Sequence, residues 1–274
     1  MTHVRVMGVI NVTPDSFSDA GVNFDAEAAI ASARGMAQAG ADLIDVGGET
    51  TNPDSRPTPP DVEQARILPV IRALAGIGVP LSADTRHAST MAAALDAGAT
   101  MINDVSALRH DPAAAALIAE RGCPVVLMHM RGEPATMHRF ARYADVALEV
   151  VQELAERIAF AEAAGIARER IIVDPGIGFA KNAGHNVELL RRLPLLRELG
   201  CPILVGVSRK RFIGRLGGES RPERRGAGSL AAGLYAASRG AAILRVHDVA
   251  ETVQALRVWQ GLAGEGLSPA ASGG

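Results

Sequence analysis

VRVMGVINVTPDSFSD, residues 4–19, is the stretch that decides the fold of this chain. Its first half is apolar and has the pattern of a short buried strand. At Asn11 the pattern changes to polar residues and the turn sequence TPDS, in which proline fixes φ and Asp or Ser can bond the nearby backbone. In parallel α/β proteins, ligands bind in the loops at the carboxyl ends of buried strands. An ordinary strand followed by a surface turn would explain this stretch equally well, so the choice depends on the rest of the chain.

The same plan of a short apolar run, a polar loop and a segment with helical spacing occurs seven more times. The predicted strands are residues 4–10, 43–46, 80–83, 100–102, 125–128, 171–173, 203–207 and 242–246. The predicted helices are residues 26–39, 61–74, a segment that ends at 97, then 112–121, 143–164, 186–199, 225–238 and a last one that ends near 262. Asp61 is the expected N-terminal cap of the second helix.

Eight strand–helix units in 274 residues predict an α/β protein in which right-handed crossovers make all strands parallel. A doubly wound open sheet is the alternative. Regular repeats without a second domain favour closure into a (β/α)₈ barrel, also called a TIM barrel, which has about 250 residues. We therefore expect a single domain at residues 1–263. Residues 264–274 are rich in Gly, Ser, Ala and Pro and are expected to form a flexible tail.

The net charge of −2 and the isoelectric point near 6.4 argue against binding to nucleic acid or to an anionic membrane surface. No apolar run approaches the roughly 18 residues of a membrane-spanning helix, and the first residues lack the pattern of a signal peptide. We therefore expect a cytoplasmic protein. Cys123 and Cys201 both stand in a Gly-Cys-Pro step before a predicted strand, where we expect small buried residues rather than nucleophiles or metal ligands.

Polar side chains stand where the predicted strands pass into their loops. They are Asn11, Thr51, Asp84, Asn103, His129, Asp174, Lys210, Arg245 and His247. Since parallel strands in a closed barrel end at the same rim, these side chains are expected to meet there. The loops at the opposite ends of the strands offer no comparable set. The rim is therefore the predicted ligand site.

The chemistry to recognise a flat heterocycle is offered by Asp84, Asn103, Asp174 and Lys210. A carboxylate accepts two parallel hydrogen bonds from an amino group and a neighbouring ring N–H, while an amide and an ammonium satisfy ring nitrogens and a carbonyl. Buried carboxylates without such partners would be costly. For Asp174, an Asx turn with the Pro-Gly pair that follows it is the alternative role.

A second group, on the first and last strands, suits a phosphate-like anion: Asn11, Arg245 and His247. These strands become neighbours when a barrel closes, and Arg245 and His247 alternate along the chain, so their side chains point the same way. The region after strands seven and eight is the usual phosphate site of this fold. A buried histidine and an ion-paired arginine are the structural alternative. We find no sequence pattern for a protein-held zinc, but Asn11 could hold Mg²⁺ together with a diphosphate.

Motifs along almost the whole chain resemble, in order, the signatures of dihydropteroate synthase, the folate-pathway enzyme family targeted by sulfonamides. They are MGVINVTPDSFSD (7–19), DVGGETT (45–51), DT (84–85), INDVSA (102–107), MHM (128–130), DPGIGF (174–179), GVSRKRFIG (206–214) and RVHDV (245–249). The resemblance implies a (β/α)₈ barrel that condenses 6-hydroxymethyl-7,8-dihydropterin diphosphate with p-aminobenzoate to form 7,8-dihydropteroate and diphosphate. Members of the family are usually homodimers.

The resemblance also implies roles for individual side chains. The pterin would be held by Asp84, Asn103, Asp174 and Lys210, and the diphosphate by Asn11, Arg245 and His247, with Mg²⁺ beside Asn11. The p-aminobenzoate site would be bordered by Phe17, Thr51, Pro53 and Ser208. Departure of diphosphate leaves a pterin-methylene cation that the arylamine attacks. The residues expected to take part in catalysis are Asp15, Asp84, Lys210 and Arg245.

One position departs from the family pattern, because Asn52 stands where an arginine usually precedes the proline. Asparagine lacks the charge and the flat face of a guanidinium, and we expect Arg56, in the same loop, to take its place. Three other functions are weighed against the synthase: a pterin-binding methyltransferase barrel, a Schiff-base enzyme that uses Lys210, and a non-catalytic pterin-binding protein. We see no corrinoid-binding segment in the sequence, and the first and last motifs favour diphosphate chemistry.

Overall fold

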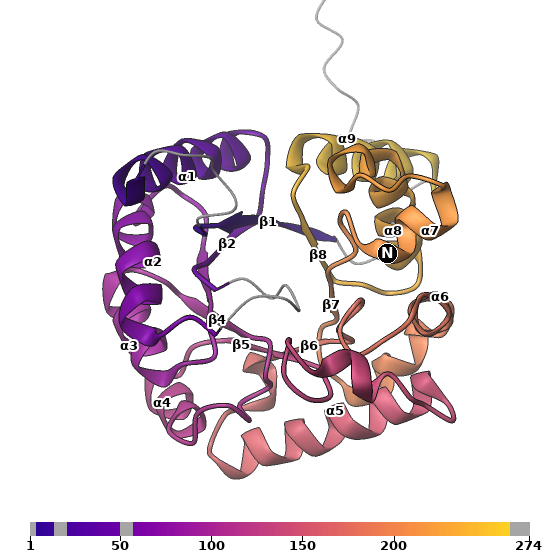
Figure 1. The fold of residues 1–274 in the computed structure, drawn as a ribbon, viewed down its shortest axis with the longest axis horizontal. Coiled ribbons are helices and arrows are strands. Elements are labelled where there is room, and N and C mark those ends of the chain that lie inside the picture. Colours follow the sequence, from indigo (N-terminus) through magenta and orange to yellow (C-terminus); the bar gives the residue numbers. More distant parts are fainter. Residues whose placement is uncertain (1–3, 14–20, 50–56, 264–274) are drawn as a thin grey trace, which may run out of the picture.

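The computed structural model describes residues 4–13, 21–49 and 57–263, and within them eight parallel strands form one sheet. The strands are β1 (Arg5–Asn11), β2 (Leu43–Gly47), β3 (Leu81–Asp84), β4 (Met101–Asp104), β5 (Val125–Met128), β6 (Ile171–Asp174), β7 (Leu204–Val205) and β8 (Ile243–Val246). Their order is β6-β5-β4-β3-β2-β1-β8-β7, and a parallel bridge between Val173 and Ile203 joins its two ends. Figure 1 looks into the resulting ring. The predicted single-domain (β/α)₈ barrel is confirmed.

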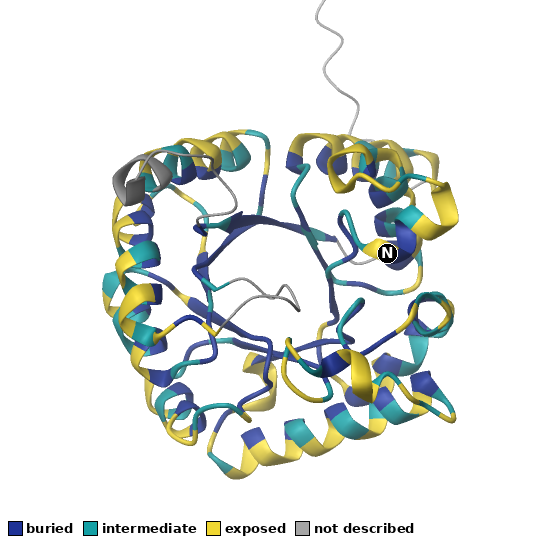
Figure 2. Ribbon diagram, in the orientation of Figure 1, coloured by how far each residue is buried: buried dark blue, intermediate teal, exposed yellow. Residues whose placement is uncertain are grey.

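Helices cover the outside of the ring of strands (Figure 1). They are α1 (Gly21–Gln38), α2 (Pro60–Leu74), α3 (Ala88–Ala97), α4 (Ala114–Arg121), α5 (Val146–Ala163), α6 (Ala183–Arg191), α7 (Arg211–Gly217), α8 (Gly226–Ser238) and α9 (Val249–Leu262). Short 3₁₀ helices lie at η1 (Met137–Phe140), η2 (Arg168–Arg170), η3 (Leu193–Leu199) and η4 (Pro222–Arg224). Figure 2 shows that the helices bury the face toward the strands and expose the opposite face. In the part of the chain that the structure describes, no helix is long and apolar enough to span a membrane.

Two of the differences from the predicted helices have a clear cause in the sequence. α2 begins at Pro60 with Pro59 as its N-cap, so Asp61 lies in the first turn and is not the cap. The fixed φ of proline suits the first helical position, which explains the earlier start. The helix predicted at residues 186–199 is divided into α6 and η3, because Pro194 has no N–H to donate to a continuous α-helix.

The helix α7 is absent from the sequence predictions, and it adds a second helix between β7 and β8. Its seven residues, RFIGRLG, contain two glycines, and only Phe212 and Ile213 are buried. A segment this short shows too few apolar positions for the helical period to be recognised. α7 begins directly after Lys210, which is its N-cap residue, so the helix fixes where that lysine leaves the rim.

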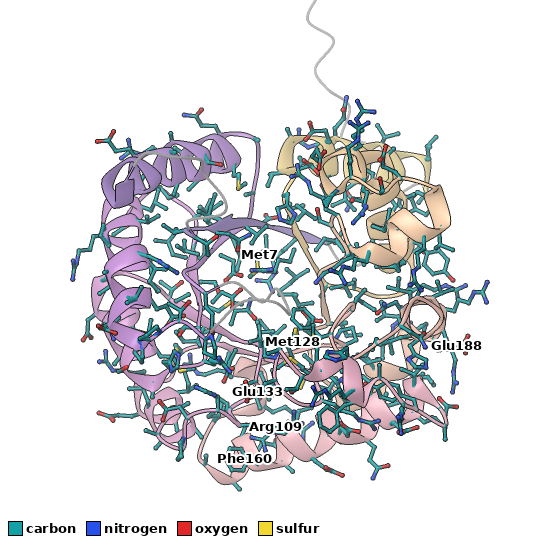
Figure 3. All side chains as sticks on the ribbon, in the orientation of Figure 1. Met7, Arg109, Met128, Glu133, Phe160 and Glu188 are labelled. Atoms are coloured by element: carbon teal, nitrogen blue, oxygen red, sulfur yellow. The ribbon has the colours of Figure 1, made fainter. Side chains whose placement is uncertain are left out.

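The interior of the barrel is divided into an apolar floor and a polar mouth. The floor consists of the inward-facing side chains Met7, Leu43, Met101, Val126, Ile172, Leu204 and Ile243. Figure 3 shows Met7 inside the ring of strands. Two residues after four of these side chains, and so on the same face of each strand, stand Asp45, Asn103, Asp174 and Arg245. Every second side chain of a strand faces the barrel interior. The strands that fill the floor with apolar side chains therefore also place polar side chains at one mouth of the barrel.

The end of α3 provides a test of backbone geometry that is independent of function. Gly98 ends this helix with a φ of 117°, in the left-handed region, and a Cβ there would lie 2.9 Å from the Cβ of Ala75. Gly98→Ala should therefore lower the free energy of unfolding by roughly 1–2 kcal/mol, as measured by denaturant titration. The control is Gly35→Ala in α1, where the added Cβ would meet nothing within 4 Å. It should raise the free energy of unfolding by up to about 1 kcal/mol, and equal effects of the two changes would contradict this account.

Candidate active site

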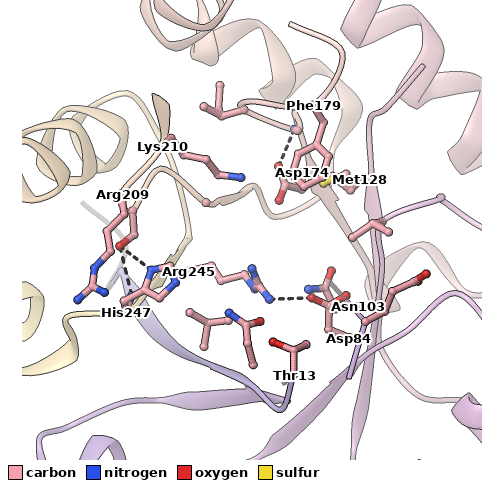
Figure 4. Close-up of a pocket in the computed structure, with 18 residues that line it drawn as sticks. Thr13, Asp84, Asn103, Met128, Asp174, Phe179, Arg209, Lys210, Arg245 and His247 are labelled. Carbon is pink, nitrogen blue, oxygen red and sulfur yellow. Dashed lines mark hydrogen bonds and ion pairs between the residues drawn. The ribbon is translucent and has the colours of Figure 1, made fainter. Parts of the chain in front are cut away.

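A cavity of about 350 Å³ opens at the carboxyl ends of the strands. Eight of the residues predicted for the ligand site line it, and Figure 4 shows most of them converging from different strand ends. They are Asn11, Asp84, Asn103, Asp174, Ser208, Lys210, Arg245 and His247. The structure thus brings the predicted heterocycle group and the predicted anion group into a single cavity.

Five residues named in the sequence predictions lie outside the described residues: Asp15, Phe17, Thr51, Pro53 and Arg56. The roles given to them above stay predictions. They include the substitution of Arg56 for the arginine that the family carries at the position of Asn52, which also lies outside the described residues.

His129, which the sequence places at the rim, does not line this cavity. It is buried beside it, where its Nδ1 accepts a hydrogen bond from Nζ of Lys181 at 2.9 Å and its Nε2 lies 3.1 Å from a carboxylate oxygen of Glu153. Burial, followed by the charge of Lys181, lowers the pKa of His129 to about 4. The neutral imidazole can therefore accept on one side and donate to Glu153 on the other, so its role is to support the wall of the cavity.

Asp174 combines both roles that the sequence allows. Its Oδ1 accepts the backbone N–H of Gly176 at 2.6 Å, as in an Asx turn, and the same side chain lines the cavity. Gly176 has a φ of 66°, and a Cβ there would lie 1.9 Å from the carbonyl oxygen of His129, so only glycine fits. Burial raises the pKa of Asp174 above its ordinary value. The turn fixes one carboxylate oxygen, and no described residue bonds the other.

Lys210 approaches the same part of the cavity from the start of α7. Its Nζ lies 4.4 Å from the centroid of the Phe179 ring, within the range of a cation–π contact. Burial, with the charge of Arg245 next, lowers the pKa of Lys210 to about 8. The ammonium is therefore charged at neutral pH but loses its charge at mildly alkaline pH.

Arg245 occupies the centre of the cavity and connects the two predicted groups. Its Nε donates to Oδ2 of Asp45 at 2.6 Å, and its Nη2 donates to Oδ2 of Asp84 at 2.7 Å (Figure 4 draws the second contact). From the sequence, Arg245 is predicted to belong to the anion group alone, and Asp84 to the heterocycle group. Its guanidinium is instead paired with carboxylates, one of which, Asp84, belongs to the predicted heterocycle group.

Asp45 is a functional residue that the sequence predictions missed. It is wholly buried below Arg245, and its Oδ2 also accepts a hydrogen bond from Nδ2 of Asn103 at 2.9 Å. It thereby orients both side chains without lining the cavity itself. The sequence did contain a signal for this role. β2, LIDVG, is apolar except for Asp45, which stands two residues after the inward-facing Leu43 and so faces the barrel interior as well.

Asp84 and Asp45 both accept hydrogen bonds from the guanidinium of Arg245. The short distance between these charged groups affects the charge state of Asp84. Burial raises its pKa to about 8; Arg245 opposes the rise, while Asp45 and Glu63 add to it. Burial and the neighbouring carboxylates therefore favour the protonated form of Asp84, whereas Arg245 favours the ionised form. A ligand that offers paired N–H donors would favour the ionised form.

His247 follows β8 and faces Ser208 across the rim. The backbone N–H and Nδ1 of His247 lie 3.3 and 2.9 Å from Oγ of Ser208. Burial, followed by the charges of Arg209 and Arg245, lowers the pKa of His247 to about 4. Because Oγ accepts the backbone N–H, its own proton can go to Nδ1, which makes Nε2 the protonated nitrogen. His247 is thus a neutral hydrogen-bond donor rather than a second cation.

Arg209 is another residue of the cavity that the site prediction left out, although it lies within the GVSRKRFIG motif. Its guanidinium pairs with Asp248, with Nη2 at 2.6 Å from Oδ1, and its backbone N–H donates to Oγ of Ser229 at 2.9 Å. Its φ of 59° lies in the left-handed region, which is uncommon for a residue with a long side chain. These contacts hold the turn that carries Ser208 and Lys210 on either side of Arg209.

Asn11 lies at the end of β1 and lines the cavity with its side-chain amide. No cluster of three or more His, Cys, Asp or Glu side chains suited to a metal ion is present among the described residues. A single amide oxygen beside an anion site fits a Mg²⁺ ion that takes its other ligands from diphosphate oxygens and water. The residues present are therefore compatible with the metal that the family resemblance implies.

Comparison with known proteins supports the family resemblance described above. The family model described as pterin binding enzyme matches residues 7–247. Dihydropteroate synthase of Neisseria meningitidis serogroup C is 46% identical over 261 residues, which cover 94% of this chain and 92% of the relative. A probable bifunctional folylpolyglutamate synthase/dihydropteroate synthase of Haloferax volcanii is 49% identical over 253 residues, which cover 92% of this chain but 30% of that longer relative.

Two solved structures of dihydropteroate synthase from Xanthomonas albilineans are similar over nearly the whole chain. The structure with 4-aminobenzoic acid has a TM-score of 0.90 and 52% identity, and the match covers 96% of this chain and 94% of that one. The structure in complex with 7,8-dihydropteroate has a TM-score of 0.87 and 50% identity, with 96% and 95% covered.

Proposed function

The chain belongs to the pterin binding enzyme family and, within it, to the dihydropteroate synthases, and we propose how its cavity divides the work of that reaction. The reaction condenses 6-hydroxymethyl-7,8-dihydropterin diphosphate with p-aminobenzoate to 7,8-dihydropteroate and diphosphate, so the chain is a transferase. The observation that carries the proposal is the single cavity in which Arg245 pairs with the carboxylates of Asp45 and Asp84, and which Asn11 and His247 also line.

The pterin ring binds to Asp84, Asn103, Asp174 and Lys210. The orientation of Asn103 supports this, because its Nδ2 is used by Asp45 and its carbonyl oxygen is left to accept from a ring N–H. The two aspartates accept from the amino group and ring N–H of the pterin, and Lys210 donates to a ring acceptor. Each buried carboxylate thereby gains donors in addition to Arg245 for Asp84 and the backbone N–H of Gly176 for Asp174.

The diphosphate binds on the other side of Arg245, where Asn11 and His247 line the cavity. As the C–O bond breaks, the electron pair leaves with the diphosphate, and Arg245 and the N–H donor of His247 stabilise the added charge. We propose Mg²⁺ beside Asn11, where it would neutralise further charge on the leaving group. The methylene left behind is cationic, and a carboxylate stabilises it, either Asp84 or Asp15 from the loop after β1.

The arylamine nitrogen then forms the C–N bond and loses its proton to solvent, so the reaction needs no nucleophile from the protein. We propose that p-aminobenzoate is bordered by Ser208, together with Phe17, Thr51 and Pro53. The contact between Ser208 and His247 supports this position, because it brings the amine next to the bond that breaks.

Coupling between the two substrates tests the function directly. We expect diphosphate release from the pterin diphosphate to require p-aminobenzoate and to match the dihydropteroate formed, one for one. Removal of Mg²⁺ with EDTA should lower the rate, and added Mg²⁺ should restore it. Binding of the pterin diphosphate to folded protein without release of diphosphate would instead support a binding protein or a methyltransferase.

We further propose that the chain forms homodimers and works in the cytoplasm. Large apolar side chains are exposed on neighbouring helices: Leu216 on α7, Tyr235 on α8, and Val258, Trp259 and Leu262 on α9. Such side chains, if they form one patch, suit an interface between subunits. Cys123 and Cys201 are buried free thiols, as the sequence predicts, which suits a reducing compartment. Light scattering on the purified protein tests the dimer.

A further inference from the structure

Lys181 is a buried lysine at the end of the loop between β6 and α6, and the reaction described above does not use it. Only 9% of its surface is exposed. Its Nζ donates to the carbonyl oxygens of Gly176 and Phe179, at 3.2 and 3.0 Å, and lies 2.9 Å from Nδ1 of His129. Three acceptors thus converge on one nitrogen, and an ammonium group has three N–H donors to satisfy them.

A lysine suits this position better than the arginine that the chain uses elsewhere. Only two of the 28 basic residues are lysines, Lys181 and Lys210, and both contact this loop. A guanidinium spreads its donors over a flat fork, whereas an ammonium is compact and can serve acceptors that surround one point. Burial lowers the pKa of Lys181 to about 7, while Asp174 and Glu153 oppose the fall. The three acceptors favour the charged form, because a neutral amine would have only two N–H groups for them.

The backbone of this loop has a conformation that needs support from its surroundings. Gly176 and Gly178 have φ values of 66° and 87°, and Ala180 has a φ of 50°, which is uncommon for a residue with a Cβ. The N–H of Phe179 donates to the carbonyl oxygen of Gly176 at 3.0 Å and closes the turn. Such conformations persist when several contacts fix them together. Lys181 supplies two of these contacts, at the first and last residues of the turn.

The same loop forms one wall of the substrate cavity. Gly176, Ile177 and Phe179 line the cavity together with Asp174. The backbone N–H of Gly176 donates to Oδ1 of Asp174 at 2.6 Å (Figure 4). The ring of Phe179 has its centroid 4.4 Å from Nζ of Lys210. A shift of the loop would therefore move the contacts of two side chains that are assigned to the pterin ring.

We propose that Lys181 is a positioning residue for the pterin: its bonds to Gly176 and Phe179 fix the loop, and through the loop the carboxylate of Asp174, without touching a substrate. This inference rests on the proposed function. It concerns binding of the ring rather than departure of the diphosphate, because the residues assigned to the diphosphate belong to β1, β8 and the segment after β8.

The test measures the Kd for the pterin diphosphate by calorimetry without p-aminobenzoate, and KM and kcat by steady-state kinetics, in Lys181→Met. Methionine keeps nearly the length of lysine but has no N–H donor. We expect Kd and KM for the pterin diphosphate to rise at least roughly tenfold and kcat to change by less than about threefold, because the ring is held equally before and during the reaction. A mere loss of folded protein would lower the apparent kcat and leave KM unchanged.

The matched control is Arg168→Met, at the opposite end of the same strand. Arg168 lies in η2, directly before β6, and its Nη1 donates to the carbonyl oxygen of Leu199 at 2.8 Å. This change also removes a cation that bonds a backbone carbonyl, but it should leave the Kd unchanged. Lys181→Gln keeps two N–H donors on a shorter side chain and should lie between the wild type and Lys181→Met.

A double-mutant cycle with Asp174→Asn completes the test. If Lys181 acts through Asp174, the two changes together should raise the Kd by less than the product of their separate effects. Independent effects, an unchanged Kd in Lys181→Met, or a fall in kcat with an unchanged KM would each overturn the inference. If Lys181→Met does not fold, Lys181→Gln in the same cycle decides the question. A wild type that fails to couple diphosphate release to product would overturn the proposed function instead.

Discussion

Replacing Arg245 by alanine should lower kcat/KM for the pterin diphosphate by roughly 10- to 150-fold, because it removes a charge-assisted contact with the diphosphate worth about 1.5–3 kcal/mol. The KM for p-aminobenzoate should change little, since that substrate is assigned to Ser208 and to loop residues rather than to Arg245. Steady-state kinetics with each substrate varied in turn measures both quantities. A similar loss for both substrates would contradict the division of the cavity proposed here.

The same change should also lower stability, because Arg245 is the cation shared by Asp45 and Asp84. Removing one partner of a buried ion pair costs about 3–5 kcal/mol, and the side chain of Arg245 is about a quarter exposed, so the lower end of this range applies. Without the guanidinium, the pKa of Asp84, which burial already raises, rises further. Groups with raised pKa values favour the folded state at acidic pH, so the loss should be smaller at pH 5 than at pH 8.

Arg245→Lys is the matched control for this prediction. It keeps one positive charge but cannot donate to Asp45 and Asp84 from two fixed nitrogens. It should therefore recover most of the stability and part of the activity. If the alanine variant is as stable as the wild type at pH 8, the shared ion pair is not a stabilising feature of the fold.

The fold could be predicted because two periods repeat along the chain. Each apolar run is short enough to be a buried strand, and each is followed by a segment with helical spacing, as at residues 125–128 and 143–164. The failures at Asp61, at Pro194 and in α7 arise where the signal is one or two residues long. A cap or a short helix depends on which neighbour supplies a donor or an apolar contact, and the local pattern does not contain that information.

The site could be predicted only in part, for a related reason. Polar residues at strand ends, such as Asp84 and Lys210, are visible because closure of a barrel brings all strand ends to one rim. The pairing of Arg245 with Asp45 joins residues 200 positions apart, and nothing in either neighbourhood indicates it. Burial and the contact with Ser208 favour a neutral imidazole at His247, and neither can be recognised from its place in a motif.

Asp84→Asn is expected to separate the charge of this side chain from its shape. Asparagine has one acceptor oxygen where the carboxylate has two, and its amide nitrogen would face the N–H donors of the pterin. We expect kcat/KM for the pterin diphosphate to fall by roughly 100-fold, from the lost hydrogen bond and the donor left unpaired. The fold should be retained, because Arg245 keeps its bond to Asp45.

The pH dependence makes this prediction specific. In the wild type, ionised Asp84 is needed to accept the pterin donors, and its raised pKa of about 8 means that binding improves as pH rises from 6 toward 8. Above pH 8, Lys210 loses its proton, so kcat/KM should fall again. In Asp84→Asn the rise below pH 8 should be absent and the fall above it should remain. If the variant shows the same rise as the wild type, a group other than Asp84 is titrating.

The stability of the wild type relative to Asp84→Asn should change with pH in the opposite direction to pterin binding. Because the pKa of Asp84 in the folded protein lies above its ordinary value of 3.8, this group favours the folded state most below pH 4, and that contribution is lost as pH rises through 8. Asparagine cannot titrate, so the free energy of unfolding of the wild type relative to Asp84→Asn should decline between pH 4 and pH 8. The wild type would then bind the pterin best near pH 8, where Asp84 contributes least to the stability of the fold. This is expected for a buried carboxylate whose ionised form is stabilised by the ligand. A constant difference in stability across this range would show that Arg245 keeps Asp84 ionised throughout.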